Sequence, residues 1–239
     1  MLVFAKSHVG KIRKTNQDAY IALPERNLLA VADGMGGHLG GDIASLTAIK
    51  VLEEFVKKHD GNPEEILLEA LQEANKRILA ASVNNALLEG MGTTLTAALI
   101  ADNKLVIGHV GDSRAYLLQE GQFHQLTYDH SFVGELLRKG NISIQEADLH
   151  PQKNILVRAL GTMETIDVDI LVFEIEQGSK LLLTSDGLTN MLSKDEIEEV
   201  LLSEEPEHAV EKLIALALDR GGTDNITAVL GVMEGETVQ

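Results

Sequence analysis

Short runs rich in Val, Leu and Ile recur along this chain and constrain its fold more than any other feature. Runs of this length and composition, bounded by turn residues, are typical of β-strands. They lie at 2–5, 18–23, 27–32, 94–101, 104–110, 114–118, 168–175, 180–184 and 226–233. Asp102-Asn103 and Glu120-Gly121 separate neighbouring runs as two-residue turns, so residues 94–127 are predicted to form an antiparallel meander.

Helical patterns divide these runs into groups. Residues 42–58 carry apolar side chains at helical spacing, and Asn62-Pro63 begins a second helix that continues to about Leu88. A capping box at Ser193 predicts a helix over 194–202, and Pro206 predicts another that ends near 219. Strands and helices in this order indicate an α+β fold. We expect a four-layer α-β-β-α sandwich, in which two central antiparallel sheets are flanked by helices.

The segment from about 129 to 167 interrupts this pattern. It combines a short helical stretch at 132–139 with an irregular stretch around His150-Pro151. We expect a small subdomain or lid inserted between strands. No repeat or flexible linker divides the chain of 239 residues, so residues 1–239 are predicted to form a single domain.

Composition excludes several classes of protein. The formal net charge of −17 disfavours nucleic acid and anionic membranes as partners. The absence of Cys excludes disulfides, thiolate zinc sites and a cysteine nucleophile. The N-terminus lacks a signal-peptide pattern and no apolar run approaches the roughly 20 residues of a membrane span, so a cytoplasmic protein is expected. Because no coiled-coil heptads are evident, we expect a monomer.

Aspartates stand at the ends of four apolar runs. Asp33, Asp112 and Asp186 follow such runs, and Asp224 precedes one. A single Asp-Gly pair is ordinary turn chemistry. Four strand ends that each carry a carboxylate can converge at the rim of a sandwich, where a cation must offset their charges. An all-oxygen set favours Mg²⁺ or Mn²⁺, with Ca²⁺ as an alternative.

Two further segments contain candidate site residues. Glycines are dense from 33 to 41, which fits close approach of a ligand as well as a loop before a helix. His38 lies among them, and taken alone it fits a surface or packing role better than that of a ligand or proton donor. Arg13 can bind a phosphate through two parallel hydrogen bonds, although a solvated loop arginine would have the same pattern.

Seven motifs in order link these segments. The chain resembles the metal-dependent protein phosphatase 2C (PPM) family in its compact bacterial form, from about residue 2 to 233. The motifs are Arg-x-x-Asn-Gln-Asp at 13–18, Val-Ala-Asp-Gly-Met-Gly-Gly-His at 31–38, Gly-Met-Gly-Thr-Thr at 90–94, Val-Gly-Asp-Ser-Arg at 110–114, Leu-Thr-x-Asp-His-Ser at 126–131, Thr-Ser-Asp-Gly-Leu at 184–188 and Gly-x-x-Asp-Asn at 221–225.

The resemblance implies roles for these residues. Asp33 would bridge two Mn²⁺ or Mg²⁺ ions, and the Gly34 carbonyl would bind the second of them. Asp186 and Asp224 would complete the protein ligands of the first ion. The resemblance further implies that Asp18 holds a metal-bound water, that Asp112 and Asp186 hold a weaker third ion, and that Arg13 binds the substrate phosphate.

One position departs from part of the family. Some members carry a His directly after the Asp-Gly pair, as the proposed general acid, whereas this chain has Met35. His38 does not occupy that position, so His38 and a metal-bound water both stay open as proton donors. The segment 129–167 corresponds to the family's flap, which influences substrate choice.

The resemblance implies direct hydrolysis of phosphoserine and phosphothreonine by a metal-activated water. The substrates would be phosphoproteins, and the partner a eukaryotic-like Ser/Thr kinase whose action the enzyme opposes. One alternative is a non-catalytic phosphoprotein-binding or metal-sensing module of the same fold, against which the intact set of aspartates argues. Another is a metal-dependent phosphodiesterase or nuclease, which the charge of −17 disfavours.

Overall fold

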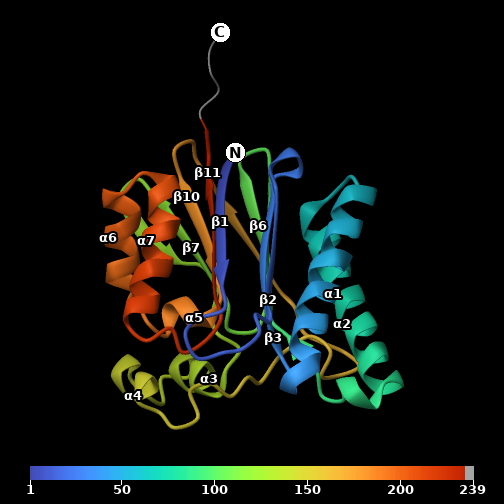
Figure 1. Cartoon of the computed structure of the whole chain (residues 1–239). Coiled ribbons are helices and arrows are strands. Elements are labelled where there is room, and N and C mark those ends of the chain that lie inside the picture. Colours follow the sequence, from blue (N-terminus) through green and yellow to red (C-terminus); the bar gives the residue numbers. More distant parts are fainter. Residues whose placement is uncertain (235–239) are drawn as a thin grey trace.

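Two antiparallel sheets lie face to face in the middle of the molecule (Figure 1). The structure is a computed structural model, and it describes residues 1–234 apart from the side chains of 37–39 and 148. One sheet has the strand order β1-β11-β10-β7-β8 and the other β2-β3-β5-β6-β9, with β4 paired to β3. The strands are β1 (Leu2–His8), β2 (Asp18–Leu23), β3 (Leu28–Met35), β4 (Gly92–Thr93), β5 (Leu95–Ala101), β6 (Lys104–Val110), β7 (Arg114–Gln119), β8 (Gln122–Gln125), β9 (Asp169–Glu174), β10 (Lys180–Thr184) and β11 (Ile226–Val232).

Helices cover the outer faces of both sheets. We name each sheet after its two edge strands, as the β2–β9 sheet and the β1–β8 sheet. The long helices α1 and α2 pack on the β2–β9 sheet, and α6 and α7 pack on the β1–β8 sheet (Figure 1). The short helices α3 and α4 belong to the inserted segment, and α5 begins directly after β10. The α-helices are α1 (Gly37–Lys58), α2 (Pro63–Asn84), α3 (Phe132–Arg138), α4 (Ile144–Asp148), α5 (Asp186–Thr189), α6 (Lys194–Ser203) and α7 (Pro206–Asp219), and the 3-10 helices are η1 (Pro24–Arg26) and η2 (Ala86–Leu88).

Three aliphatic clusters fill the spaces between the four layers. One joins α1 and α2 to their sheet, one joins α6 and α7 to theirs, and the third lies between the two sheets. Burial of this apolar surface is the main favourable contribution to folding. The arrangement confirms the predicted four-layer α-β-β-α sandwich with antiparallel sheets.

The predicted meander over 94–127 is wrong in one respect. The turns at Asp102-Asn103 and Glu120-Gly121 do join neighbouring strands, but β5 and β6 lie in one sheet and β7 and β8 in the other. The chain changes sheet at the turn over 111–113. Gly111 makes this possible because its φ of +112° is a backbone conformation that other residues rarely adopt.

Helix α1 begins earlier than its sequence pattern suggests. The glycine-rich stretch was expected to be a loop up to residue 41, but the helix starts at Gly37. Close packing explains the glycines: a Cβ on Gly34 would lie 2.0 Å from the Gly41 carbonyl oxygen, and one on Gly40 would lie 2.8 Å from the Cβ of Met91. The first turn of α1 can therefore lie directly against the end of β3.

The other helix boundaries follow the predictions closely. Helix α2 ends at Asn84, and a separate 3-10 turn covers the residues up to Leu88. The capping box of Ser193 and Glu196 opens α6 as expected. None of the helices in residues 1–234 is long and apolar enough to cross a membrane.

Candidate metal centre

Aspartates from both sheets meet at one end of the sandwich. Asp18 begins β2 and pairs in register with Asp33, near the end of β3. Asp186 follows β10 as the first residue of α5, and Asp224 lies just before β11. Hydrogen bonds connect the two sheets here, because Ser185 Oγ (2.7 Å) and Thr227 Oγ1 (2.6 Å) both donate to Asp18 Oδ2. The predicted convergence of strand-end carboxylates therefore occurs.

These carboxyl groups are difficult to ionise together. Burial and the neighbouring charges of Asp18 and Asp186 raise the pKa of Asp33 well above its ordinary value. Burial is also the main cause that raises the pKa of Asp18 to about 7 and that of Asp112 to about 8. Burial and the charge of Asp224 raise the pKa of Asp186. A cluster with these properties calls for positive charge.

Two oxygens of the cluster have no hydrogen-bond partner. Asp18 Oδ1 and Asp186 Oδ1 are buried and accept no hydrogen bond, although buried polar atoms are normally satisfied. A divalent cation is a suitable partner for such atoms, and Mg²⁺ and Mn²⁺ both prefer oxygen ligands. The donor set at this end of the sandwich therefore fits a hard divalent cation.

Other side chains already hold two of the carboxylates. Asp186 Oδ2 accepts a hydrogen bond from Asn190 Nδ2 (3.0 Å), and Asp224 Oδ2 accepts one from Arg13 Nη2 (2.7 Å). Among the side chains that the structure describes, no three acidic or histidine residues already stand in the geometry of a metal site. Binding a cation between these carboxylates would thus require some of the side chains to rotate.

Arg13 lies beside the acidic cluster, on the exposed loop between β1 and β2. Its guanidinium is half-exposed, and the hydrogen bond from Arg13 to Asp224 raises the pKa of the arginine. Asn225 anchors this loop by donating to the carbonyls of Val9 (2.9 Å) and Thr15 (3.0 Å), and its Oδ1 accepts from the Gln17 amide (2.8 Å). The exposed part of the guanidinium is available to an anion.

The backbone at Asp33 and Gly34 is held tightly. The Asp33 amide donates to Thr94 Oγ1 (2.9 Å), and the Asp33 carbonyl accepts from the Thr94 amide and from Thr93 Oγ1 (both 2.9 Å). The Gly34 amide donates to the Gln17 carbonyl (3.1 Å). These bonds orient the residue on which the cluster is centred.

Sequence reasoning missed the supporting polar residues. Ser185, Thr227, Asn225 and Thr94 all contact the acidic cluster or its loops, and no role had been assigned to them. Part of their signal was present, because Ser185, Asn225 and Thr94 belong to the motifs at 184–188, 221–225 and 90–94, and Thr227 lies two residues after the motif at 221–225. Position within a motif does not reveal whether a hydroxyl points to an aspartate or to a backbone group.

The positions of two further predicted residues complete the comparison with the sequence. Asp112 lies on the turn between β6 and β7, where the charges of Asp186 and Asp129 act on it. His38 belongs to the first turn of α1, but its side chain lies outside the described part of the structure. Its candidacy as a proton donor therefore stays a prediction.

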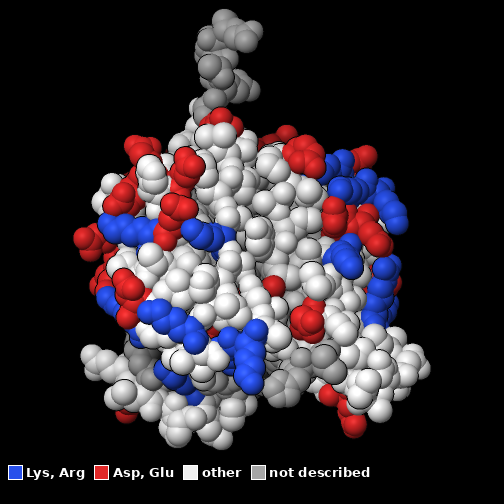
Figure 2. All heavy atoms as spheres, in the orientation of Figure 1, with Lys and Arg blue, Asp and Glu red and all other residues white. Residues whose placement is uncertain are grey.

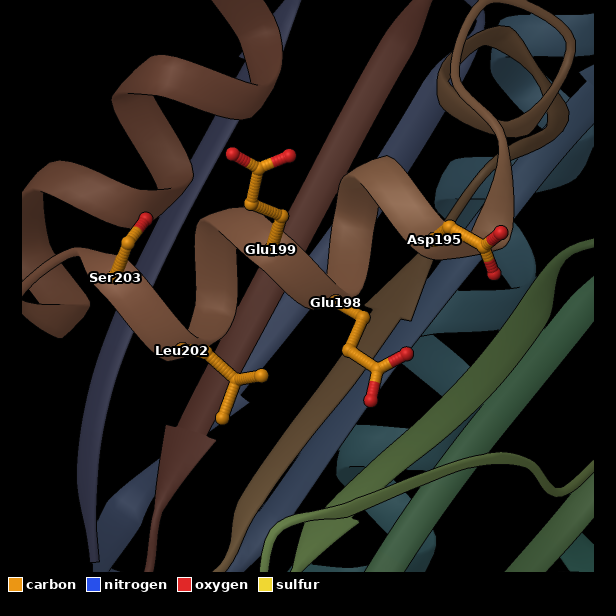
Figure 3. A pocket seen from close by; sticks show the side chains of 5 residues that line it. All are labelled: Asp195, Glu198, Glu199, Leu202 and Ser203. Atoms are coloured by element: carbon orange, nitrogen blue, oxygen red, sulfur yellow. The ribbon is translucent and has the colours of Figure 1, made fainter.

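A surface hollow on α6 offers no competing site. It is lined by Asp195, Glu198, Glu199, Leu202 and Ser203, whose side chains all project from this helix (Figure 3). No residue of the acidic cluster lines it. Acidic and basic side chains are interspersed over the face seen in Figure 2, and neighbouring carboxylates on an exposed helix are ordinary surface composition. We assign no chemistry to this hollow.

Comparisons with known proteins agree with the site. The family model for protein phosphatase 2C matches residues 6–218. The serine/threonine phosphatase stp of Listeria monocytogenes is 45% identical over 230 residues, which cover 92% of this chain and 91% of that protein. The serine/threonine protein phosphatase PstP of Mycobacterium tuberculosis is 41% identical over 227 residues, covering 95% of this chain and 44% of that protein.

Solved structures show the same fold. The crystal structure of the Mycobacterium tuberculosis phosphatase PstP/Ppp has a TM-score of 0.92 at 39% identity, with 98% of this chain and 99% of that chain covered. The catalytic domain of PstP in complex with two manganese ions has a TM-score of 0.88 at 39% identity, with 96% of each chain covered. Together with the converging aspartates, these similarities confirm the resemblance found in the motifs, and the chain belongs to the protein phosphatase 2C family.

Proposed function

We propose that this protein is a metal-dependent serine/threonine phosphatase that hydrolyses phosphoserine and phosphothreonine in proteins. The observation that carries the proposal is the cluster of half-buried aspartates, in which two buried oxygens have no hydrogen-bond partner, next to a half-exposed arginine. Such a site combines ligands for hard cations with a guanidinium that can bind a phosphate. The relatives described above are named serine/threonine phosphatases, which supports the same function.

Each residue of the cluster has a proposed role. Asp33, the Gly34 carbonyl, Asp186 and Asp224 would hold two Mn²⁺ or Mg²⁺ ions, and Asp112 would hold a third, weaker ion together with Asp186. The structure with two manganese ions supports this number for a relative. When bound, such ions activate water as a nucleophile near neutral pH and offset the charge of the phosphoryl oxygens.

The protein's own residues orient the reactants. Arg13 would bind the phosphoryl group through its exposed N–H groups, and Asn225 keeps the Arg13 loop at a fixed distance from the cluster. Ser185 and Thr227 hold one oxygen of Asp18, which leaves the other free to orient a water molecule. His38 stays the candidate side chain for protonating the leaving oxygen.

The biological setting is also a proposal. The expected substrates are phosphoproteins, and the expected partner is a Ser/Thr kinase that phosphorylates them. We propose that the enzyme acts in the cytoplasm as a monomer, with one domain over 1–239 and the flap over about 129–167 influencing which substrates bind. The absence of a membrane-spanning helix in residues 1–234 is compatible with this setting.

The deciding experiment measures hydrolysis and metal dependence together. Purified protein is assayed with p-nitrophenyl phosphate and with a phosphothreonine peptide, in Mn²⁺, in Mg²⁺ and in EDTA. We expect turnover that requires the cation. Asp33→Asn should lower this activity by more than about 100-fold, because even substitution of a residue that only supports a metal ligand lowers metal affinity or activity by about 10- to 100-fold. Asp102→Asn, in the exposed turn after β5, is the matched control.

Two results would contradict the proposal. Turnover in EDTA equal to that in Mn²⁺, or near-normal turnover by Asp33→Asn, would reject the metal assignment. Absence of hydrolysis by a folded protein that still binds Mn²⁺ would favour the alternative, a non-catalytic binding module. A phosphodiester substrate in the same assay tests the nuclease alternative.

A further inference from the structure

His130 is a buried histidine outside the acidic cluster, and both of its ring nitrogens are engaged. Its Nδ1 accepts a hydrogen bond from the Gly111 amide (3.1 Å), and its Nε2 lies 3.1 Å from Asp169 Oδ2. Because Nδ1 accepts from an N–H group, the ring proton must be on Nε2, which donates to Asp169. Burial lowers the pKa of His130, in agreement with this neutral form.

The same residue holds both backbone groups of Gly111. Besides the bond at Nδ1, the His130 amide donates to the Gly111 carbonyl (2.8 Å). On its other side Gly111 lies against Thr94, since a Cβ on the glycine would be 2.5 Å from the Cβ of Thr94. The turn that carries Asp112 is therefore fixed between His130 and Thr94.

His130 also connects this turn to two parts of the flap. It lies at the beginning of the segment, directly before Ser131, which caps α3. Later in the segment, the Val157 amide donates to the His130 carbonyl (2.8 Å), and the neighbouring Arg158 donates from Nη1 to Asp169 Oδ1 (2.8 Å). One side chain and its backbone thus join the Asp112 turn, the flap and the start of β9.

A second buried histidine keeps this ring in place. The rings of His109 and His130 are 4.6 Å apart at their centres. His109 is itself held by Thr96 Oγ1 (2.9 Å) at Nδ1 and by the Tyr128 carbonyl (3.1 Å) at Nε2. A ring with polar partners at both nitrogens and a packed neighbour has little freedom to turn, which is the condition for orienting another residue.

We propose that His130 is a positioning residue that holds the Gly111 backbone so that Asp112 can bind a divalent cation, and that it couples this turn to the flap. The inference rests on the proposed function, because that proposal makes Asp112 a cation ligand. The hydrogen bond from Gly111 to Nδ1 is the one that positions Asp112. The hydrogen bond from Nε2 to Asp169 links His130 to the end of the flap and the start of β9.

Two substitutions separate the nitrogens. In His130→Asn the amide oxygen can take the place of Nδ1, so the Gly111 bond is kept and the Asp169 bond is lost. In His130→Gln the longer side chain can reach Asp169 but no longer accepts from Gly111. Mn²⁺ binding is measured by titration calorimetry for wild type, both variants and Asp112→Asn, and amide hydrogen exchange is followed at Gly111.

We expect wild type to show a weak Mn²⁺-binding step that Asp112→Asn lacks. His130→Gln should weaken this step by about tenfold or more and speed exchange of the Gly111 amide, whereas His130→Asn should retain both within a few-fold. Thermal unfolding of each variant identifies any that fail to fold. A merely structural role would lower the stability of both His130 variants without this difference.

The outcomes separate the inference from the proposed function. The inference is overturned if folded His130→Gln keeps the weak step, if folded His130→Asn loses it, or if wild type has no such step. Should His130→Gln not fold, the Mn²⁺ titration of His130→Asn still tests the inference, because loss of the weak step in this variant would overturn it. Hydrolysis of p-nitrophenyl phosphate by wild type in Mn²⁺ tests the phosphatase activity itself, so its absence would reject the proposed function independently of these titrations.

Discussion

His109 predicts a specific acid sensitivity of the fold. Its side chain is fully buried in β6, and burial lowers its pKa from 6.5 to about 4. Between these two pH values the histidine of the unfolded chain binds a proton that the folded protein does not bind. Stability therefore falls as the pH falls from about 6.5 to 4.

The size of this effect follows from the shift. A difference of 6.5 − 4 = 2.5 pKa units corresponds to about 3 kcal/mol, at about 1.36 kcal/mol per unit. The substitution His109→Gln removes the titration but can keep a donor to the Tyr128 carbonyl. The variant should be less stable than wild type at pH 7, and this difference should shrink by about 3 kcal/mol at pH 4.

Urea unfolding at a series of pH values, with EDTA in all samples, measures the effect. The aspartates of the cluster also titrate in this range, but they do so in both proteins, so their contribution cancels in the difference. His124→Gln, on the exposed side of β8, controls for the loss of a histidine. Parallel pH profiles for wild type and His109→Gln would refute the reasoning.

Three other perturbations test the site. Arg13→Ala should raise the KM for a phosphothreonine peptide by roughly 10- to 100-fold, because the variant loses a hydrogen bond to a charged group. An unchanged KM in steady-state kinetics would contradict phosphate binding by Arg13. Asn225→Ala should lower the free energy of unfolding by about 2–4 kcal/mol in urea titrations, because it leaves two carbonyls and one amide of the Arg13 loop without their partner. Gly187→Ala places a Cβ 1.9 Å from the Asn225 carbonyl oxygen, so calorimetry should show a clear drop in Tm. A Tm equal to that of wild type would mean that the backbone shifts to relieve this contact at no cost in stability.

Sequence patterns predicted the layers of the fold and part of the acidic cluster. Asp33 and Asp186 were found because each stands beside a turn residue at the end of an apolar run, and strand ends of packed sheets meet at a common rim, although the chain separates the two residues widely. Asp18 has no such signal and was expected only from the resemblance to the phosphatase family.

Contacts without a local signal could not be predicted. The bond between Arg13 and Asp224 joins residues 211 positions apart, and nothing near either residue indicates it. The change of sheet at Gly111 depends on tertiary packing against Thr94 and His130, and an isolated glycine before an aspartate gives only a turn. The same holds for α1, whose glycines are poor helix formers in isolation and are helical because they pack against β3 and Met91.

Neither sheet contains the acidic cluster by itself. The β2–β9 sheet supplies Asp18 and Asp33, and the β1–β8 sheet supplies Asp186 and Asp224 at its strand ends, so the cluster forms only when the two sheets pack. Packing brings these negative charges together and is opposed by their repulsion. A cation that binds carboxylates from both sheets binds the folded chain and not the unfolded one, and it therefore stabilises the packing by an amount that grows with the logarithm of its affinity. The affinity for the cation and the stability of the sheet packing therefore both depend on the same interface. A residue that orients a ligand also contributes to holding the two sheets together.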